Sequence, residues 1–279
     1  MVTNLRTDDE RLSGEFLNML LYLRAVMQLI SATIITFNEE KNIRRCLESL
    51  QGVADEIIVV DSLSTDNTKN ICTELGVHFI EQKFLGYIEQ KNFAVGQTKY
   101  DFVLSLDADE ALDEPLKEAI LQIKQQGSQA DSYKMNRCTS FCGKWIKHGT
   151  WYPDKKIRLF NKQKAKWAGV NPHDRIEIAA GSTCEYVKGD ILHYSYSSLE
   201  EVVTQANKFT TIQAQAMYDK GKRASALNLI VNPSMAFISG YIFKAGFMDG
   251  TDGFILAKTI AYQTLLKYAK LMHIQKNKF

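Results

Sequence analysis

The first half of the chain alternates short apolar runs with segments that have the spacing of helices. Four continuous apolar, β-branched runs have the length of buried strands: 29–37, 56–61, 77–80 and 102–106. Helices are expected between them, over 38–50, 64–75 and 87–95. This alternation is typical of an α/β fold with a doubly wound, mostly parallel sheet, in which one half resembles a Rossmann nucleotide-binding unit.

The pattern changes after residue 131, where short strands are separated by aromatic and basic loops. These strands are predicted at 133–137, 156–160 and 184–187. Helix returns over 199–220 and over 254–272, where an apolar stripe suits packing on the domain or lying in a membrane interface. The stretch 228–243 is apolar, but Asn232-Pro233 interrupts it, so we predict no membrane span there.

These patterns divide the chain into three parts. Residues 1–26 form an N-terminal extension, 27–195 an α/β domain with its halves at 27–110 and 111–195, and 196–279 a helical C-terminal region. No signal peptide is predicted, because acidic residues precede the apolar stretch after Leu17 and Arg24 interrupts it. We hypothesise that Met27 is the physiological start and that 1–26 is upstream translation or a peripheral helix.

Charge and cysteine content narrow the function classes. The net charge of +2 gives no reason to propose nucleic acid as a partner. Residues 221–279 carry eight basic and two acidic side chains, a net +6 that is compatible with an anionic membrane surface or with a solvated helical face. The five scattered cysteines complete no zinc pattern and are expected to be reduced, as in a cytoplasmic protein.

Polar residues follow three of the predicted strands. Asp107 and Asp109 come directly after the run 102–106, while Asn38 with Glu39 and Asp61 with Ser64 end two other strands. Two carboxylates one residue apart can converge on Mg²⁺ or Mn²⁺, which often shares its ligands with substrate phosphates. A solvated turn is the alternative for that pair alone. Because ligands of doubly wound sheets bind beyond the carboxyl ends of the strands, we expect the three groups to converge in one cleft.

Taken in order, these segments resemble a known family. Four motifs carry the likeness: Thr36-Phe37-Asn38-Glu39-Glu40, 59–68, Gln90-Lys91-Asn92 and Leu106-Asp107-Ala108-Asp109-Glu110. They resemble the family 2 glycosyltransferases of the GT-A fold, and more narrowly the bacterial lipopolysaccharide-core β-1,4-glucosyltransferase group. Later segments fit the same group: Trp151-Tyr152-Pro153, 157–160, His173-Asp174-Arg175, His193-Tyr194-Ser195 and 246–250.

The resemblance implies a nucleotide-sugar half at 27–110 and an acceptor half at 111–195. It places the nucleotide sugar against eight residues: Thr36, Phe37, Glu39, Asp61, Gln90, Lys91, Asp107 and Ala108. Of these, Asp61 is expected to bond the uracil or ribose and Lys91 the diphosphate, with a solvated helix lysine as the alternative for Lys91. Asp109 is the expected direct ligand of Mg²⁺ or Mn²⁺, and Asp107 would reach the ribose or the metal.

The resemblance also supplies a candidate general base. Inverting transfer needs a carboxylate to deprotonate the acceptor hydroxyl, and Asp174 fits that role; a surface pair with Arg175 is the alternative. His173 is expected to orient the site. His193 would complete the metal shell or be a satisfied core histidine. Four aromatic residues are placed on the acceptor side or in the core: Trp145, Trp151, Tyr152 and Trp167.

We therefore expect a metal-dependent, inverting hexosyltransferase. It would move a sugar, glucose by expectation, from a UDP-sugar to a lipid-linked glycan such as lipopolysaccharide core. The protein would be cytoplasmic and peripheral on the inner membrane. Two alternatives stay open at this point: transfer to polyprenyl phosphate or another surface polysaccharide, and a non-catalytic nucleotide-sugar-binding membrane scaffold.

Overall fold

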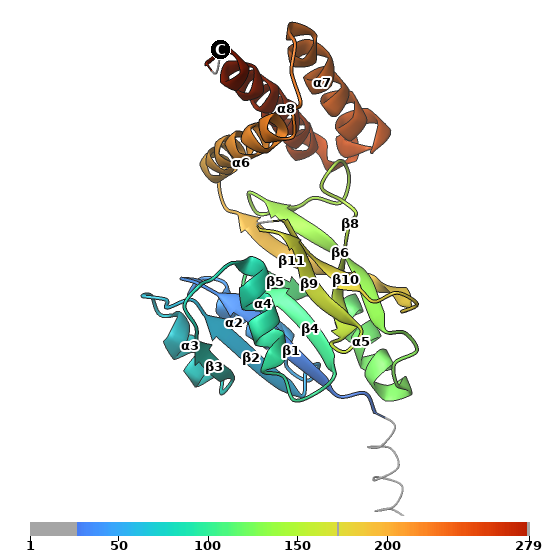
Figure 1. Cartoon of the computed structure of the whole chain (residues 1–279). Helices are drawn as coiled ribbons and strands as arrows, with labels where there is room; N and C mark the ends of the chain where they lie inside the picture. Colours follow the sequence, from blue (N-terminus) through green and yellow to red (C-terminus); the bar gives the residue numbers. More distant parts are fainter. Residues whose placement is uncertain (1–26, 172, 278–279) are drawn as a thin grey trace, which may run out of the picture. The chain divides into compact units, whose positions relative to one another are not determined.

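The computed structural model describes residues 27–171 and 173–277, so the hypothesis about residues 1–26 lies outside the described residues (Figure 1). The described chain groups into two compact units. The first unit runs to Met135 and includes Lys156–Gly189, and the second consists of Asn136–Lys155 and the residues from Asp190 onward. The domain boundary expected at residue 195 stays a prediction. In their packing, however, residues 136–155 belong with the C-terminal helices.

The nucleotide half is a parallel sheet, as the apolar runs predicted. Its strands are β1 (Ile30–Thr36), β2 (Glu56–Asp61), β3 (His78–Glu81) and β4 (Phe102–Asp107), hydrogen-bonded in the order β3-β2-β1-β4. The connecting helices are α2 (Ile43–Ser49), α3 (Thr68–Glu74) and α4 (Tyr87–Gly96). Strands β1, β2 and β4 are almost wholly buried, which explains their uninterrupted apolar character. The α/β fold class is confirmed.

The remaining strands were less visible in the sequence. The sheet continues from β4 through β8 (Asp154–Asn161), which runs antiparallel to it, to β6 (Ser132–Phe141), β11 (Cys184–Tyr196) and β5 (Glu110–Leu112). The short β7 (Lys144–Trp145) pairs with β6, and β9 (Ala165–Val170) forms a separate antiparallel ribbon with β10 (His173–Ile178). Helix α5 (Glu114–Gln126) was not predicted, although Asp113 caps it by accepting from the Leu116 N–H at 2.8 Å.

Three long helices and two short turns form most of the second unit. They are α6 (Leu199–Asp219), α7 (Ala226–Ile238), the π-helical turn η1 (Ser239–Phe243), the 3₁₀ turn η2 (Gly246–Asp249) and α8 (Gly250–Asn277). Helix α8 packs against both α6 and α7 (Figure 1). The expected interruption at Asn232-Pro233 is wrong, because the backbone stays helical from Ala226 to Phe243 with Pro233 inside it. Proline removes one backbone hydrogen-bond donor, but the helical turns before and after Pro233 remain continuous.

That helical stretch is also long and apolar enough to cross a membrane, by length and composition only. It is the one such helix among the described residues, and 6% of it is buried.

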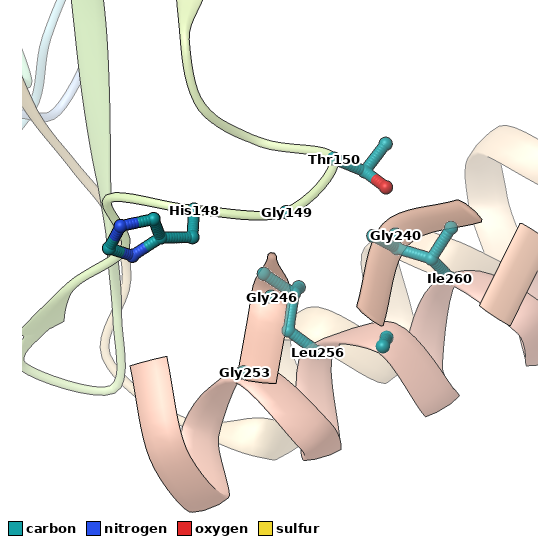
Figure 2. A pocket seen from close by; sticks show the side chains of 9 residues that line it. His148, Gly149, Thr150, Gly240, Gly246, Gly253, Leu256 and Ile260 are labelled. Atoms are coloured by element: carbon teal, nitrogen blue, oxygen red, sulfur yellow. The ribbon is translucent and has the colours of Figure 1, made fainter. Parts of the chain in front are cut away.

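Glycines and one buried aspartate hold a loop of the second unit against its helical turns. A Cβ on Gly246 would lie 2.7 Å from the Gly240 carbonyl oxygen, so only glycine permits this approach. Asp249 accepts hydrogen bonds from the backbone N–H of His148 at 2.8 Å and contacts its Nδ1 at 2.9 Å. Figure 2 shows the loop at His148–Thr150 lying beside Gly246 and Gly240. The 246–250 motif therefore anchors this loop.

We predict that Gly189→Ala destabilises the fold much more than Gly181→Ala. Both glycines have positive φ, but a Cβ on Gly189 would meet the Leu116 backbone nitrogen at 2.4 Å, whereas nothing lies within 4 Å at Gly181. The expected losses of unfolding free energy are about 3 kcal/mol or more for Gly189→Ala and about 1–2 kcal/mol for Gly181→Ala. Urea denaturation measures both, and equal losses would contradict the predicted backbone clash.

Candidate active site

The carboxyl ends of the parallel strands meet at one edge of the sheet. In the strand register Thr36 lies beside Asp61, and Ile35 lies beside Asp107. The site residues predicted at three separate strand ends are therefore brought to one edge, where doubly wound sheets bind their ligands. Thr36 and Asp61 are buried there, while Asp107 is half-buried.

Two loops at this edge, residues 38–40 and 64–66, are joined by hydrogen bonds. Asn38, in left-handed conformation at φ 55°, donates its N–H to Ser64 Oγ at 2.7 Å and accepts the Thr65 N–H at 2.8 Å. The N–H of Glu40 donates to Asp66 Oδ2 at 3.0 Å. Asparagine tolerates positive φ and bonds its neighbours through its side chain, so the Asn38 position suits this crossing. The segment 64–68, which leads into α3, thus shapes the predicted nucleotide pocket.

The predicted pocket contains polar atoms that are buried without protein partners. Asp61 accepts the Ser64 N–H at 2.7 Å, and Gln90 donates to Ser62 Oγ at 3.2 Å. Within the described part of the chain, however, the Thr36 hydroxyl and the side-chain oxygen Oε1 of Gln90 have no hydrogen-bond partner. Phe37 stands beside them with 57% of its surface exposed. Unsatisfied buried polar groups and an exposed ring are features that a bound base or ribose would complete.

Lys91 is a buried cation between two carboxylates. It lies on α4 with 5% of its surface exposed, and its Nζ is 2.8 Å from Asp107 Oδ1 and 2.8 Å from Asp174 Oδ2. The same Nζ lies 4.2 Å from the ring centroid of Trp167 on β9. The alternative of a solvated helix lysine is wrong, since the side chain points into the core of the first unit and both neighbouring carboxylates bind it.

Arg158 is the central residue that sequence reasoning missed. It is buried on β8, and its Nη2 donates to Asp107 Oδ2 at 3.0 Å and to Glu110 Oε1 at 2.7 Å. Glu110 in turn accepts the Asp107 N–H at 3.0 Å. In the sequence, Arg158 can be recognised only as a charged residue inside the apolar run 157–160, where a buried cation needs a partner.

The two cations set the electrostatics of Asp107. Burial alone would raise the pKa of Asp107, but the charges of Lys91 and Arg158 outweigh it and hold this pKa well below its usual range. Burial likewise lowers the pKa of Arg158, and Glu110 and Asp107 more than reverse that effect. Arg158 keeps two buried donors, Nε and Nη1, without a partner among the described residues.

Glu39 and Asp109 form the more negative side of the site. Burial raises the pKa of Glu39; the Asn42 amide opposes that shift, and the charges of Asp109, Asp66 and Asp107 add to it. Carboxylate oxygens that repel one another in this way fit a hard cation such as Mg²⁺ or Mn²⁺. No group of three or more His, Cys, Asp or Glu side chains arranged to hold a metal ion occurs among the residues described, so Asp109 and Asp107 stay predicted ligands. Ala108, between them, is buried.

Asp174 lies on β10, in a strand that the sequence did not reveal. Its carboxylate is largely buried and binds Lys91, so the expected alternative of a surface pair with Arg175 is wrong; Arg175 binds Glu177 instead. The backbone of His173 pairs with Val170, and its side chain lies outside the described atoms. The structure therefore brings the candidate base to the same ammonium as the strand-end carboxylate.

Strand β9 holds α4 and the Lys91 side chain in place. The Asn92 amide donates to the Trp167 carbonyl at 2.9 Å and accepts the Trp167 N–H at 3.1 Å. The Trp167 ring belongs to the core of the first unit and covers Lys91. Of the two alternatives for Trp167, the acceptor side or the core, its burial favours the core.

The other predicted aromatics and His193 lie in the second unit. Trp145 meets Tyr194 edge to face with centroids 4.9 Å apart, and Trp151 stacks on Tyr196 at 5.4 Å. Tyr152 donates to Asp190 Oδ1 at 3.0 Å. His193 is half-buried, with Nδ1 3.2 Å from Thr139 Oγ1. A role of these groups in acceptor binding, or of His193 toward a metal, stays a prediction.

Residues 31–188, more than half of the chain, match the sequence profile of the family described as Glycosyl transferase family 2. The chain belongs to glycosyl transferase family 2. The resemblance of the motifs to this family is thereby confirmed, whereas the narrower lipopolysaccharide-core group stays a prediction; the chain is a glycosyltransferase that uses nucleotide sugars.

Individual relatives extend the match over nearly the whole chain. An uncharacterized glycosyltransferase of Rickettsia typhi is 33% identical over 89% of this chain and 88% of its own length. The lipopolysaccharide core biosynthesis glycosyltransferase LpsC of Rhizobium meliloti is 29% identical over 87% of this chain and 91% of its own length. Among solved structures, S. aureus TarS in complex with UDP-GlcNAc is similar over 90% of this chain and 92% of its own, at 14% identity and a TM-score of 0.44.

We predict that Arg158→Met destabilises this glycosyltransferase by about 3–5 kcal/mol at pH 7, because it leaves the buried Glu110 and the half-buried Asp107 beside one fewer cation. The folded-state pKa of Asp107 is depressed, so its ion pairs stabilise the fold above its ordinary pKa of about 4 and lose that effect as the pH falls further. The deficit should therefore shrink below about pH 4.

Urea denaturation at several pH values measures this deficit. The control is Arg44→Met, which removes an exposed pair with Glu74 and should leave the stability nearly unchanged, because water and salt screen exposed pairs. A loss for Arg158→Met as small as that of the control would show that the buried pairs are not stabilising.

Proposed function

We propose that this glycosyltransferase transfers glucose from UDP-glucose, with inversion, to a hydroxyl of a lipid-linked glycan such as lipopolysaccharide core. One observation carries the proposal: the Lys91 ammonium joins Asp107 at the donor edge to Asp174, with 2.8 Å to each. A single cation thus connects the place where a sugar diphosphate would bind with a carboxylate able to accept a proton.

The donor would lie along the carboxyl edge of β1, β2 and β4. Asp61 would accept from the uracil or ribose, and the unsatisfied hydroxyl of Thr36 offers a further donor there. Lys91, a point charge with three donors, would turn from Asp107 toward the diphosphate oxygens. Asp109 and Asp107 would hold Mg²⁺ or Mn²⁺, which neutralises charge on the departing nucleoside diphosphate.

Asp174 would act on the acceptor. As the acceptor oxygen forms its bond to the anomeric carbon, the carboxylate takes the hydroxyl proton, and the bond from that carbon to the diphosphate oxygen breaks on the opposite face. Arg158 and Glu110 would keep the Asp107 carboxylate in place during this exchange, because both lie buried around it. The set of buried, mutually bonded charges argues against a scaffold that only binds the nucleotide sugar.

The acceptor class is supported by a relative and not by the site itself. LpsC, which is 29% identical over 91% of its length, carries a lipopolysaccharide core biosynthesis name. A lipid-linked acceptor also agrees with a peripheral position on the cytoplasmic face of the inner membrane, which we propose for this protein.

Asp174→Asn is expected to lower kcat about 10²–10⁴-fold, because the amide cannot accept the acceptor proton. Donor affinity should not weaken, since the variant removes a competitor for Lys91. UDP release measures turnover and calorimetry measures donor binding. Glu177→Gln, on the exposed part of the same strand, is the matched control and should keep full activity. Unchanged turnover of Asp174→Asn would remove this residue as the base.

Asp109→Asn is expected to abolish the gain in donor affinity that Mn²⁺ gives the native protein, a gain of about tenfold or more, equivalent to about 1.4 kcal/mol. Calorimetry with and without Mn²⁺ over UDP-, GDP-, dTDP- and CMP-sugars measures it and identifies the donor. Asp101→Asn, at the opposite end of β4, should behave as the native protein. A native donor affinity that is independent of metal would exclude the cation from this site.

A further inference from the structure

Helix α7 and the turns after it expose an apolar surface in the second unit. No residue of α7 is buried. The apolar patch consists of six side chains that are 43–77% exposed: Leu227, Ile230, Val231, Met235, Phe243 and Met248. Leu227, Val231 and Met235 recur every four residues and so form one stripe along the helix. Exposed apolar surface that is contiguous in this way marks an interaction site.

The other side of the same helix is covered by α8. Phe237 stacks on Tyr241 with centroids 5.3 Å apart and meets Phe254 of α8 edge to face at 5.8 Å. Lys258 of α8 places its ammonium 4.4 Å from the Phe237 ring centroid. Since α8 occupies this side of α7, the apolar patch needs a partner from outside the described chain.

The charged residues within the stretch of sequence that carries the patch are all basic. From residue 220 to residue 248 the sequence contains four basic residues and no acidic one: Lys220, Lys222, Arg223 and Lys244. The acidic residues that follow are already engaged, Asp249 by His148 at 2.9 Å and Asp252 by Lys144 at 3.2 Å. Basic residues thus stand at both ends of the apolar helix.

We propose that the apolar patch docks onto an anionic lipid bilayer, with α7 lying in the interface and the basic residues at its ends on the lipid headgroups. Apolar side chains with flanking Lys and Arg are the composition that interfacial helices use on anionic membranes. A second copy of this chain fits worse, because a symmetric dimer through the patch would bring basic ends against basic ends.

The fold favours an interfacial helix over a spanning one. The helical stretch of 18 residues is about 27 Å long, slightly less than the hydrocarbon thickness of about 30 Å. The chain then turns back at Lys244 and the left-handed Ala245 into α8, which packs along α7. Insertion across the bilayer would carry Lys258 of α8 into hydrocarbon, where a charge is strongly disfavoured.

The test compares two double variants of the full chain on vesicles. Ile230→Gln with Phe243→Gln alters the patch, and Val203→Gln with Ile212→Gln changes two apolar residues of α6, also exposed though less so, as the control. Vesicles of equal parts phosphatidylcholine and phosphatidylglycerol are compared with pure phosphatidylcholine. Because all four residues are exposed, thermal unfolding should be unchanged in both variants.

The native protein and the α6 control should bind the anionic vesicles more tightly than the neutral ones. The patch variant should bind the anionic vesicles at least about tenfold more weakly than the native protein does. Alkaline carbonate should release the bound protein. Native-like binding of the patch variant, or no native binding to either vesicle, would overturn the proposal. So would retention after carbonate, which indicates spanning, or a native dimer that the patch variant dissociates.

This inference rests on the proposed function only in that a lipid-linked acceptor would explain why the protein binds a membrane. Vesicle binding is measured without donor, and donor affinity is measured by calorimetry without vesicles. Lost vesicle binding with intact donor affinity would therefore overturn the docking surface alone, whereas absent donor binding with intact vesicle binding would overturn the proposed transfer.

Discussion

The buried Lys91 ammonium is the interaction on which the arrangement of this site depends. It holds Asp107 and Asp174, while Arg158 holds Asp107 and Glu110. These two cations and three carboxylates come from α4, β4, β5, β8 and β10. Because an unpaired charge is costly in a protein interior, no member is stable there without the others. The charge network therefore fixes the relative positions of the five elements that carry it.

The same network prepares the site for a charged ligand. Glu39 and Asp109 add negative charge next to it; burial raises the pKa of the half-buried Glu39, and the charges of Asp109 and Asp107 add to that shift. A donor diphosphate needs cations, and a metal needs anions, so a site that contains both signs can take the pair together. In the proposed reaction Lys91 would exchange a carboxylate for a diphosphate oxygen, which would loosen its hold on Asp174 when the donor is in place.

The sequence indicated the parallel half of the sheet because its strands are buried on both faces and read as unbroken apolar runs. The β9–β10 ribbon mixes buried residues with exposed ones and therefore gives no such signal. The burial of Lys91 also escaped prediction, since Trp167, 76 positions later, covers it. Similarly, Glu110 makes Arg158 tolerable from another strand, so their pairing could not be read from local sequence.

The two units solve opposite problems of burial. The first unit encloses charged side chains that water would otherwise solvate, and the second leaves apolar side chains of α7 in the open. Each is unfavourable alone: the first because of desolvation, the second because exposed apolar surface promotes association. In the proposed function, a soluble, anionic sugar nucleotide would relieve the first and a lipid surface would relieve the second. An enzyme that joins a water-soluble donor to a lipid-linked acceptor meets both ligands, so this proposal would account for both departures from ordinary burial by a single function.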